Sequence, residues 1–462
     1  MLAIAAIIYQ RQSKHEDSVS DQEKLEKILN ALLKIERKNP LEGSPRAAIG
    51  YGGCLDVLVN ATDILKCDTW DWDHVKPSHH DTIRSYLEFQ ETFVYFFQHG
   101  AAAERYISSK EVWHSLTKAS QKINSRREGV GGNAPLMSLR FAHEGWQVLL
   151  GAMMSPRLVE LLHQNISFAG SSTPEDDLHL ILEYPLGAKC GPYEAPRANR
   201  FIVHSDENNP KVSALTPFGE ALRTYNPHLL IVSGLQMMDN FPLQDEEKRG
   251  ILKSISYQMQ SMGPDTQIHF EMASFTEKEF LEDLIKYIIP HADSLGMNEQ
   301  ELPNLFSMLT YGNVSILSSS NPRVATTLDY MRRVFSMLSN STGRPITRLH
   351  VHTLAYQAIV TKKGSSWKNT MPATAKASLT ANRHVCGSSN VNLEKARLIM
   401  DDSFSTSQVQ QERIWFNERK PVSCWEEGNL DFCIAPVLVC TEVHQTVGGG
   451  DNISAGGLIL QV

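Results

Sequence analysis

The chain has 462 residues, of which 42% are hydrophobic and 21% charged, a composition typical of a globular protein and not of a disordered or collagen-like one. This length predicts one large domain together with a smaller one. The net charge of −8 and the dispersed Lys and Arg residues argue against nucleic-acid binding.

The chain begins with a short apolar run, Leu2–Tyr9, which is too short to span a bilayer. It has the length of a secretory signal core but lacks preceding basic residues, so an ordinary exposed start is the alternative. Glycosylation tripeptides begin at Asn60, Asn165, Asn313 and Asn340. We expect the secretory pathway, in the endoplasmic reticulum or as a secreted protein, with the cytoplasm as the alternative. No other segment is apolar enough to cross a membrane.

The cysteines give little direct indication of function. Their positions are Cys54, Cys67, Cys190, Cys386, Cys424, Cys433 and Cys440. No CxxC pair occurs, so neither a zinc motif nor a redox motif is expected. The odd number excludes complete internal pairing and leaves open one disulfide among the last four.

Apolar patterns predict one helix and four strands in chain order. Gln22–Ile35 has apolar residues at helical spacing and predicts an amphipathic helix. Leu229–Ser233 and Gln267–Glu271 are typical of buried strands. Arg348–Leu354 and Phe432–Cys440 are typical of two further strands. Strands that alternate with helical stretches indicate βαβ units and therefore an α/β fold with a mainly parallel sheet.

Two further segments have recognisable local patterns. Thr276 and Glu279 have the spacing of a capping box, which predicts a helix from there to about Ile289, ended by Pro290. Thr361–Asn382 is rich in Lys, Ser, Thr and Ala, and we expect it to be a surface excursion.

A glycine turn near the end of the chain is the first candidate for chemistry. Gly448, Gly449 and Gly450 precede Asp451, and a helix can begin directly behind them. A helix N-terminus exposes unpaired N–H groups that suit a phosphoryl group, and an aspartate there can remove a proton from an attacking hydroxyl. The alternative from these residues alone is a plain turn with Asp451 as the helix N-cap.

The wider pattern resembles a known family. Gly448–Asp451 resembles the GxGD motif of ribokinase-like sugar kinases, and Thr446–Ala455 resembles the end of the ADP-dependent glucokinases, in particular their animal members. The resemblance runs from about residue 45 to the last residue. It implies a kinase of glycolysis that transfers phosphate from ADP to the 6-hydroxyl of glucose and leaves AMP, with Asp451 as the catalytic base.

Two acidic motifs resemble the metal-binding motifs of this family. His269 and Glu271 match its HxE motif, and Asn298 and Glu301 match its NxxE motif. The resemblance implies one Mg²⁺ ion, held largely through water by Glu271 and Glu301 together with Asp451. Oxygen ligands and retained waters are what Mg²⁺ prefers. His269 and Asn298 are expected to hold the two glutamates in place.

The sugar-binding residues are also implied by the resemblance. Gly131, Gly132 and Asn133 match a GGNA segment, in which glycines let the backbone approach the sugar and the amide bonds hydroxyls. Asp56 occupies the position of an aspartate that binds the sugar. Glu91 is similar to a glutamate that separates glucokinases from phosphofructokinases, because an anionic side chain repels a sugar phosphate. A capping Asn and a helix-surface glutamate are the ordinary readings of these residues.

The remaining matches concern the nucleotide. Arg200 matches a family arginine that reaches the phosphates, for which a planar guanidinium is well suited, and Arg197 has a weaker claim. The amides of the glycine turn are expected to assist Arg200. His352 and Val447 are expected beside the adenine, although a buried core histidine is an equally good reading of His352.

The family implies a domain organisation. A ribokinase-like large α/β domain carries a smaller α/β lid that closes over the sugar and excludes water. We expect residues 1–21 to be the apolar start and 22–462 the kinase, with the lid interleaved within 52–225 and most of the large domain within 226–462. We expect a monomer that binds ADP and glucose.

One departure leaves alternatives open. Gly52-Gly53 stands where the family usually has Asn-Ala, which makes the sugar less certain than the donor. One alternative is a relative that uses another sugar, a nucleoside or ATP. Another is a catalytically inactive nucleotide-binding protein, against which the intact Asp451, Glu271 and Glu301 argue.

Overall fold

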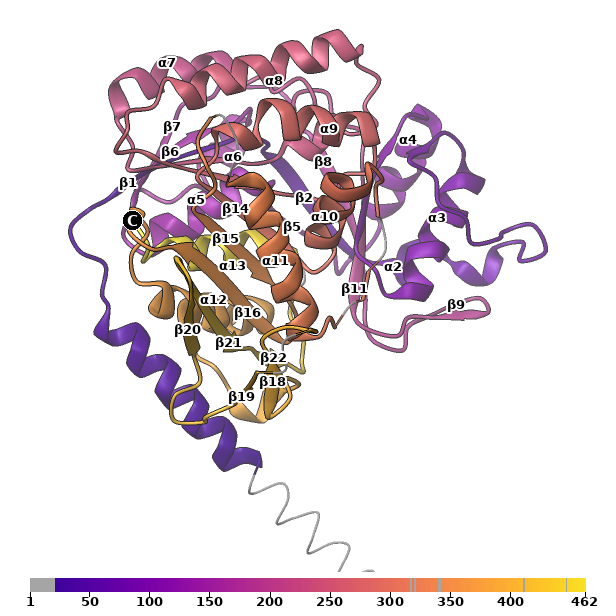
Figure 1. Ribbon diagram of the computed structural model, residues 1–462. Helices are drawn as coiled ribbons and strands as arrows, with labels where there is room; N and C mark the ends of the chain where they lie inside the picture. The colour runs from indigo at the N-terminus through magenta and orange to yellow at the C-terminus, as the bar shows by residue number, and fades with distance from the viewer. Residues whose placement is uncertain (1–20, 316–317, 320, 340–342, 410–411, 446) are drawn as a thin grey trace, which may run out of the picture.

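The computed structural model describes residues 21–315, 318–319, 321–339, 343–409, 412–445 and 447–462 (Figure 1). The apolar start Leu2–Tyr9 and the tripeptide at Asn340 lie outside these residues. The predicted amphipathic helix is present over residues 21–38, and it buries Ile28 and Leu32 against the C-terminal part of the sheet. In the described part of the chain, no helix combines the length and apolar character that crossing a bilayer requires.

A ten-stranded sheet forms the centre of the large domain. Its strands in order are β20 (Ser423–Glu427), β21 (Leu430–Pro436), β16 (Tyr356–Lys362), β15 (Arg348–His352), β14 (Ser294–Asn298), β13 (Gln267–Glu271), β12 (Leu229–Val232), β1 (Arg46–Gly50), β6 (Gln147–Gly151) and β7 (Ile166–Phe168). The strands from β15 to β7 are parallel, and β16, β21 and β20 are antiparallel. The expected α/β fold with a mainly parallel sheet is confirmed.

Helices cover both faces of this sheet (Figure 1). One face carries α7 (Leu215–Tyr225), α8 (Asp245–Gln260), α9 (Lys278–Tyr287), α10 (Glu301–Tyr311) and α11 (Val324–Leu338). The other face carries α5 (Asn133–His143), α12 (Thr370–Val385) and α13 (Gly449–Leu458). The alternating side chains of the central strands are buried on both sides, as parallel sheets require.

A second sheet has six strands, both parallel and antiparallel, and we call it the lid sheet. Its order is β3 (Thr82–Ile83), β4 (Ala103–Ile107), β11 (Asn199–His204), β8 (Leu178–Tyr184), β2 (Cys54–Asn60) and β5 (Arg127–Gly131). Its back face packs with α2 (Ala61–Leu65), α3 (Tyr86–His99) and α4 (Lys110–Ser120). Residues 133–168, between β5 and β8, return to the large sheet as α5, β6, α6 (Pro156–Val159) and β7.

Short strand pairs complete the structure. They are β9 (Lys189–Cys190) with β10 (Tyr193–Glu194), β17 (Ala396–Leu398) with β22 (Leu438–Cys440), and β18 (Ser403–Ser405) with β19 (Arg413–Trp415). The segment Phe432–Cys440, predicted as one strand, is two strands that separate at Val437, because β21 stays in the large sheet while β22 pairs with β17. The other three predicted strands are confirmed to within two residues.

The prediction of a surface excursion at Thr361–Asn382 is wrong. The segment ends β16 and then forms α12, whose residues from Ala373 to Asn382 are all buried. Small side chains let α12 pack closely on the glycine-rich α13, where a Cβ added at Gly456 would lie 2.7 Å from the Thr380 hydroxyl. In this segment, a composition rich in Ala, Ser and Thr therefore indicates a helix that packs closely against another helix, and not a surface loop.

The predicted helix after β13 is present as α9, but the capping box is wrong. The helix N-cap is Glu277, and its side chain makes no capping bond. The Asp239 carboxylate instead accepts hydrogen bonds from the backbone N–H groups of Thr276 and Glu277, at 2.7 and 2.9 Å. The start of α9 is therefore held by Asp239, which is distant in the sequence, and not by a residue of the helix itself.

Three disulfides are formed where the sequence left open one. They join Cys67 to Cys190, Cys386 to Cys440 and Cys424 to Cys433, and Cys54 is a buried free thiol. The first joins η1 (Cys67–Thr69) to β9, the second joins the end of α12 to β22, and the third joins β20 to β21.

Candidate active site

The candidate site lies where the central parallel strands end. Glu271 is the last residue of β13, Asn298 of β14 and His352 of β15, and the glycine turn leads into α13 beside them. Carboxyl ends of parallel strands lie at one edge of a sheet, where ligands bind in open α/β folds.

The glycine turn is the N-terminus of α13. Gly448 is the N-cap residue with φ 64°, a left-handed conformation that favours glycine, and no side chain caps the helix. The first N–H groups of α13 therefore have no intrahelical partner and remain available to an anion. Asp451 lies inside the first turn, so the alternative reading of Asp451 as an N-cap is wrong.

A hydrogen-bonded chain orients the Asp451 carboxylate. The Asn133 side-chain amide, on the first residue of α5, donates to Asp451 Oδ1 at 2.8 Å. The Gln236 amide donates in turn to Asn133 Oδ1 at 2.7 Å, which keeps the Asn133 NH₂ group toward Asp451. Gln236 received no role from the sequence, because the fold alone brings it beside Asn133.

The Asp451 carboxyl group titrates near neutrality. Burial raises its pKa to about 7, the charge of Glu271 acts in the same direction, and Asn133 and Arg200 oppose them. A base with a pKa near the working pH is both available and strong enough to accept a proton.

Glu271 is buried and held by two neighbours. Ser454 of α13 donates to Glu271 Oε1 at 2.7 Å, and His269 Nε2 lies 2.9 Å from Oε2. His269 Nδ1 is 2.9 Å from the Ser294 hydroxyl, which also accepts a hydrogen bond from buried Arg348. These contacts leave the carboxylate a single orientation.

The second glutamate, Glu301, is held by its own motif. The backbone N–H and the side-chain amide of Asn298 donate to its two oxygens, at 2.9 and 2.8 Å. Asn298 Oδ1 accepts from the N–H groups of Gln300 and Glu301 and so fixes the start of α10. His269 and Asn298 thus contact the two glutamates as the sequence led us to expect.

The two glutamates are suited to a cation. Burial raises the pKa of Glu271 and of Glu301 to about 8 each, and the Glu271 charge raises that of Glu301 further. Among the described residues, Arg348 is the cationic group whose charge opposes this shift at Glu271. Buried carboxylates with so little compensation, offering oxygen ligands only, fit a hard ion such as Mg²⁺.

The lid sheet contributes a second group of polar residues on the face opposite α3. Asp56 of β2 is paired in register with His179 of β8, and His179 with His204 of β11. Gly131 leaves room for Asp56, because a Cβ there would lie 1.9 Å from Asp56 Oδ1. Gly132 instead meets backbone, since its Cβ would lie 2.4 Å from Gly52 O.

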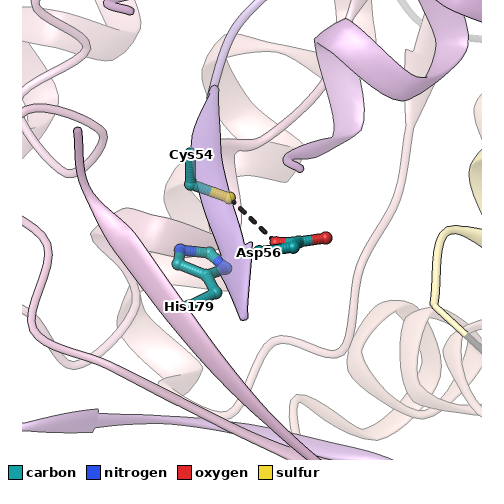
Figure 2. A group of neighbouring side chains, drawn as sticks. All are labelled: Cys54, Asp56 and His179. Atoms are coloured by element: carbon teal, nitrogen blue, oxygen red, sulfur yellow. Dashed lines mark hydrogen bonds between the residues drawn. The ribbon is translucent and has the colours of Figure 1, made fainter. Parts of the chain in front are cut away.

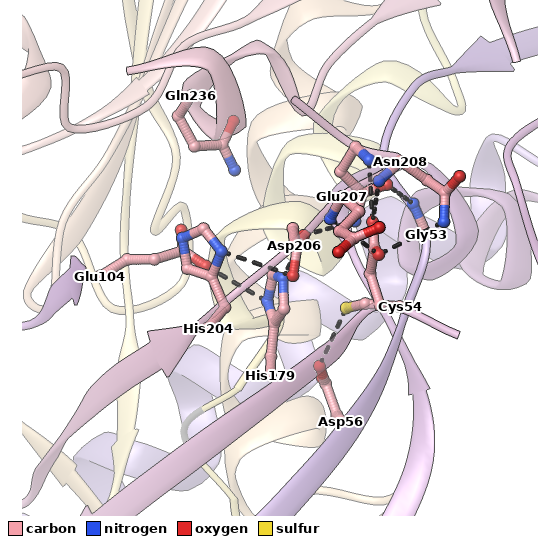
Figure 3. Close-up of polar contacts among 12 residues, drawn as sticks. Gly53, Cys54, Asp56, Glu104, His179, His204, Asp206, Glu207, Asn208 and Gln236 are labelled. Carbon is pink, nitrogen blue, oxygen red and sulfur yellow. Dashed lines mark hydrogen bonds and ion pairs between the residues drawn. The ribbon is translucent and has the colours of Figure 1, made fainter. Parts of the chain in front are cut away.

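Two carboxylates hold His179. Its Nε2 lies 2.9 Å from Asp206 Oδ2 and its Nδ1 3.3 Å from Glu104 Oε1 (Figure 3). Burial alone would lower the pKa of His179, but these two charges raise it to about 10. Burial raises the pKa of Asp56 to about 6, to which the charges of Glu104 and Asp451 contribute.

The structure brings Glu104 and His179, to which the sequence analysis gave no role, to this face, and it does not bring the predicted Glu91 there. Glu91 lies on α3, which packs on the back of the lid sheet, and its carboxylate is 2.8 Å from His80 Nε2. Glu104 is the carboxylate that faces Asp56 and His179. The signal was strand alternation, because Glu104 lies in Ala103–Ile107 with buried Ala103, Arg105 and Ile107 on the other face.

The predicted nucleotide residues lie around the turn. Arg200 extends from β11 so that its charge lowers the pKa of Asp451, and its Nε has no hydrogen-bond partner among the described residues. Arg197 Nε donates to Gly100 O at 2.6 Å, which gives it a structural contact. A Cβ at Gly450 would lie 3.2 Å from His352, and Val447 O is 2.6 Å from His384 Nε2.

The chain is similar in sequence to known kinases. The family model described as "ADP-specific Phosphofructokinase/Glucokinase conserved region" matches residues 45–460. An ADP-dependent glucokinase of Bos taurus is 34% identical over 89% of this chain and 84% of its own length. A probable ADP-dependent glucokinase of Caenorhabditis elegans is 29% identical over 90% of this chain and 84% of its own.

Solved structures share the fold. An "ADP-dependent kinase complex with fructose-6-phosphate and ADPbetaS" has a TM-score of 0.66 at 19% identity, over 94% of this chain and 97% of that one. A reconstructed last common ancestor of ADP-dependent phosphofructokinases from Methanosarcinales has a TM-score of 0.59 at 20% identity, over 94% of this chain and 97% of that one.

Proposed function

This chain belongs to the ADP-specific phosphofructokinase/glucokinase family, and we propose that it is an ADP-dependent glucokinase that transfers phosphate from ADP to glucose and leaves AMP. The observation that carries the proposal is the placement of Asp451. It combines an uncapped helix N-terminus, an orienting amide from Asn133 and two buried glutamates within one site.

The lid sheet supplies the sugar side of the proposed site. Asp56, Glu104 and His179 present two carboxylates and an imidazole that bind neighbouring hydroxyl groups. This group lies close enough to Asp451 to act on its charge, because the Glu104 carboxylate raises the pKa of both Asp56 and Asp451. A sugar held there places one hydroxyl toward Asp451.

Asp451 accepts the proton from that hydroxyl, the 6-hydroxyl in glucose. The oxygen then attacks the β-phosphorus of ADP, the bond to the bridging oxygen breaks, and AMP carries away the negative charge. Arg200 and the N–H groups at the start of α13 stabilise the charge on the transferring phosphoryl group. Asn133 keeps Asp451 in position throughout.

Glu271 and Glu301 would hold one Mg²⁺ ion, largely through its waters. When bound, such an ion neutralises the charge of the phosphates that it contacts. The chain contributes the rigidity of the two carboxylates through Ser454, His269 and Asn298.

The charge of the pocket favours glucose over a sugar phosphate. Asp56 and Glu104 lie on the lid sheet and Asp206 lies just after β11, and the cationic partner among them is His179. An anionic phosphate on the sugar would meet these carboxylates at close range, where like charges repel strongly. Fructose 6-phosphate is therefore the acceptor that we expect the chain to reject.

A panel of donors and acceptors tests the proposal. The purified chain is assayed with ADP or ATP against glucose, fructose 6-phosphate and adenosine, and sugar phosphate formation is measured. Activity with ADP and glucose alone is the expected result. Activity that requires ATP contradicts the donor, and preference for fructose 6-phosphate contradicts the acceptor.

We also infer that the chain folds in the secretory pathway. Three disulfides support this inference, because disulfides persist in oxidising compartments and are rare in the cytosol. Mass spectrometry of the chain expressed in animal cells, with free thiols blocked, tests it. Three intact disulfides are expected, and seven reduced cysteines would contradict the compartment.

A further inference from the structure

Three side chains of different chemistry converge on the site face of the lid sheet. Cys54 and Asp56 project from β2 and His179 from the neighbouring β8, as Figure 2 shows. Their ligand atoms, one sulfur, one carboxylate oxygen and one ring nitrogen, all lie within 4.8 Å of one another, and all three residues are buried. The Cys54 sulfur is 3.3 Å from Asp56 Oδ1.

This set differs from the glutamates that face the phosphates. A thiol, an imidazole and a carboxylate suit a borderline-soft ion such as Zn²⁺, whereas Mg²⁺ prefers oxygen ligands alone. Three protein ligands with the fourth position open is the arrangement of zinc sites that also admit a small molecule. We propose that Cys54, Asp56 and His179 form a binding site for Zn²⁺ within the sugar pocket, and that Zn²⁺ bound there excludes the sugar.

The neighbours of His179 support a metal ligand. Asp206 faces Nε2 of His179 and Glu104 faces Nδ1 (Figure 3). Whichever of the two nitrogens binds the ion, the other one therefore stays paired with a carboxylate. A carboxylate behind the ligating imidazole fixes its orientation and strengthens it as a ligand. The same two carboxylates lie 2.9 and 3.3 Å from the ring nitrogens, so negative charge stands beside the position of the ion.

Cys54 lies outside the disulfides, and its sulfur contacts Asp56 Oδ1. The other six cysteines are paired in disulfides, and Cys54 is the buried free thiol. A soft cation is the partner that displaces the thiol proton and binds the sulfur.

A second group in the same region is the competing location. His179, His204 and Asp206 also lie within 4.8 Å in their ligand atoms, but they offer no sulfur. Asp206 Oδ2 already accepts hydrogen bonds from His179 and from the Asn209 side chain, at 2.9 and 2.7 Å. His204 Nδ1 and Asp206 Oδ1 have no hydrogen-bond partner among the described residues, so this second group also offers ligand atoms, and the Cys54 sulfur is what distinguishes the two groups.

Exclusion of the sugar rests on the proposed function, because Asp56 and His179 serve both ligands. Binding of the ion does not rest on it. The experiment therefore measures binding by a signal that is independent of catalysis, and measures inhibition separately.

Co²⁺ is the probe, because it takes zinc sites and its bond to a thiolate gives a near-ultraviolet charge-transfer absorption. The full-length chain with intact disulfides is titrated with Co²⁺ and then with Zn²⁺, which should displace it. Cys54→Ser should remove the absorption and weaken Zn²⁺ binding by at least about 100-fold, the upper end for loss of an outer-shell partner. His204→Gln is the matched control, and it should keep the absorption.

The outcomes separate the possibilities. Binding without the thiolate absorption, lost in His204→Gln and kept in Cys54→Ser, would overturn the proposal in favour of the second group. No binding of either metal would also overturn it. In the sugar assay, Zn²⁺ should inhibit competitively with glucose in the unchanged chain and not in Cys54→Ser. If no sugar is phosphorylated while the absorption appears, the proposed function fails and the metal site stands.

Discussion

Gly296→Ala should disable the candidate metal site from a position that carries no functional group. Gly296 lies in β14, beside the end of β13, and its missing side chain leaves room for Glu271. A Cβ built there lies 2.2 Å from Glu271 Oε2 and 3.0 Å from His269 Nε2. Both the carboxylate and the imidazole that holds it must move.

The size of the displacement follows from these distances. A carbon and an oxygen approach no closer than about 3.3 Å in ordinary contacts, so the carboxylate oxygen must retreat by about 1 Å. A shift of about 1 Å in a catalytic arrangement lowers turnover by about 100-fold. Disturbed support of a metal ligand weakens metal affinity by about 10- to 100-fold, and overpacking lowers the free energy of unfolding by about 1–3 kcal/mol.

The assay measures AMP formation from ADP and glucose as a function of Mg²⁺ concentration, together with urea unfolding. Gly250→Ala, on α8 with nothing within 4 Å of the added Cβ, is the control. The control should keep the wild-type Mg²⁺ dependence and gain about 0.5–1 kcal/mol of stability. A folded Gly296→Ala protein with unchanged turnover and Mg²⁺ dependence would refute the placement of Glu271 beside the ion.

Three other predictions follow from the site. Asp451→Ala should lower turnover by about 100- to 10,000-fold while ADP binding, measured by calorimetry, is retained; equal turnover would exclude Asp451 as the base. Gly131→Ala should raise the KM for glucose and leave that for ADP unchanged, because the new Cβ lies 1.9 Å from Asp56 Oδ1; a rise in both would point to general misfolding. In the absence of Mg²⁺, the unfolding free energy should fall as pH rises from about 6.5 to about 8, above the range in which the buried histidines with lowered pKa values act in the opposite direction. The carboxyl groups of Glu271, Glu301 and Asp451 have raised pKa values, so in the folded state they hold protons that the unfolded chain has released. Added Mg²⁺ should restore the unfolding free energy most at pH 8. Thermal unfolding across this pH range checks the sign, and stability that rises with pH would contradict it.

The parts of the site that the sequence predicted are local. His269 and Glu271 are two residues apart on a strand and so share a face, and Asn298 and Glu301 are three residues apart at a helix start. Buried strands were also readable, because β12 is a short apolar run that ends at Ser233 and β13 alternates the apolar Ile268 and Phe270 with polar residues.

The parts that the sequence missed depend on long-range packing. Glu104, His179 and Gln236 reach the site from separate elements, and no local pattern joins them. Glu91 was chosen on a helix whose side of the lid sheet only the fold determines. The burial of α12 depends on the glycines of α13, some 80 residues away in the chain, so composition alone read it as exposed.

The central claim is phosphate transfer from ADP to glucose, and product analysis tests it most directly. The chain is incubated with ADP, Mg²⁺ and glucose, and AMP and glucose 6-phosphate are quantified beside an Asp451→Ala control. Equal amounts of the two products, absent from the control, are the predicted result. AMP without sugar phosphate, products formed equally by the control, or sugar phosphate formed only when ATP replaces ADP would contradict the claim.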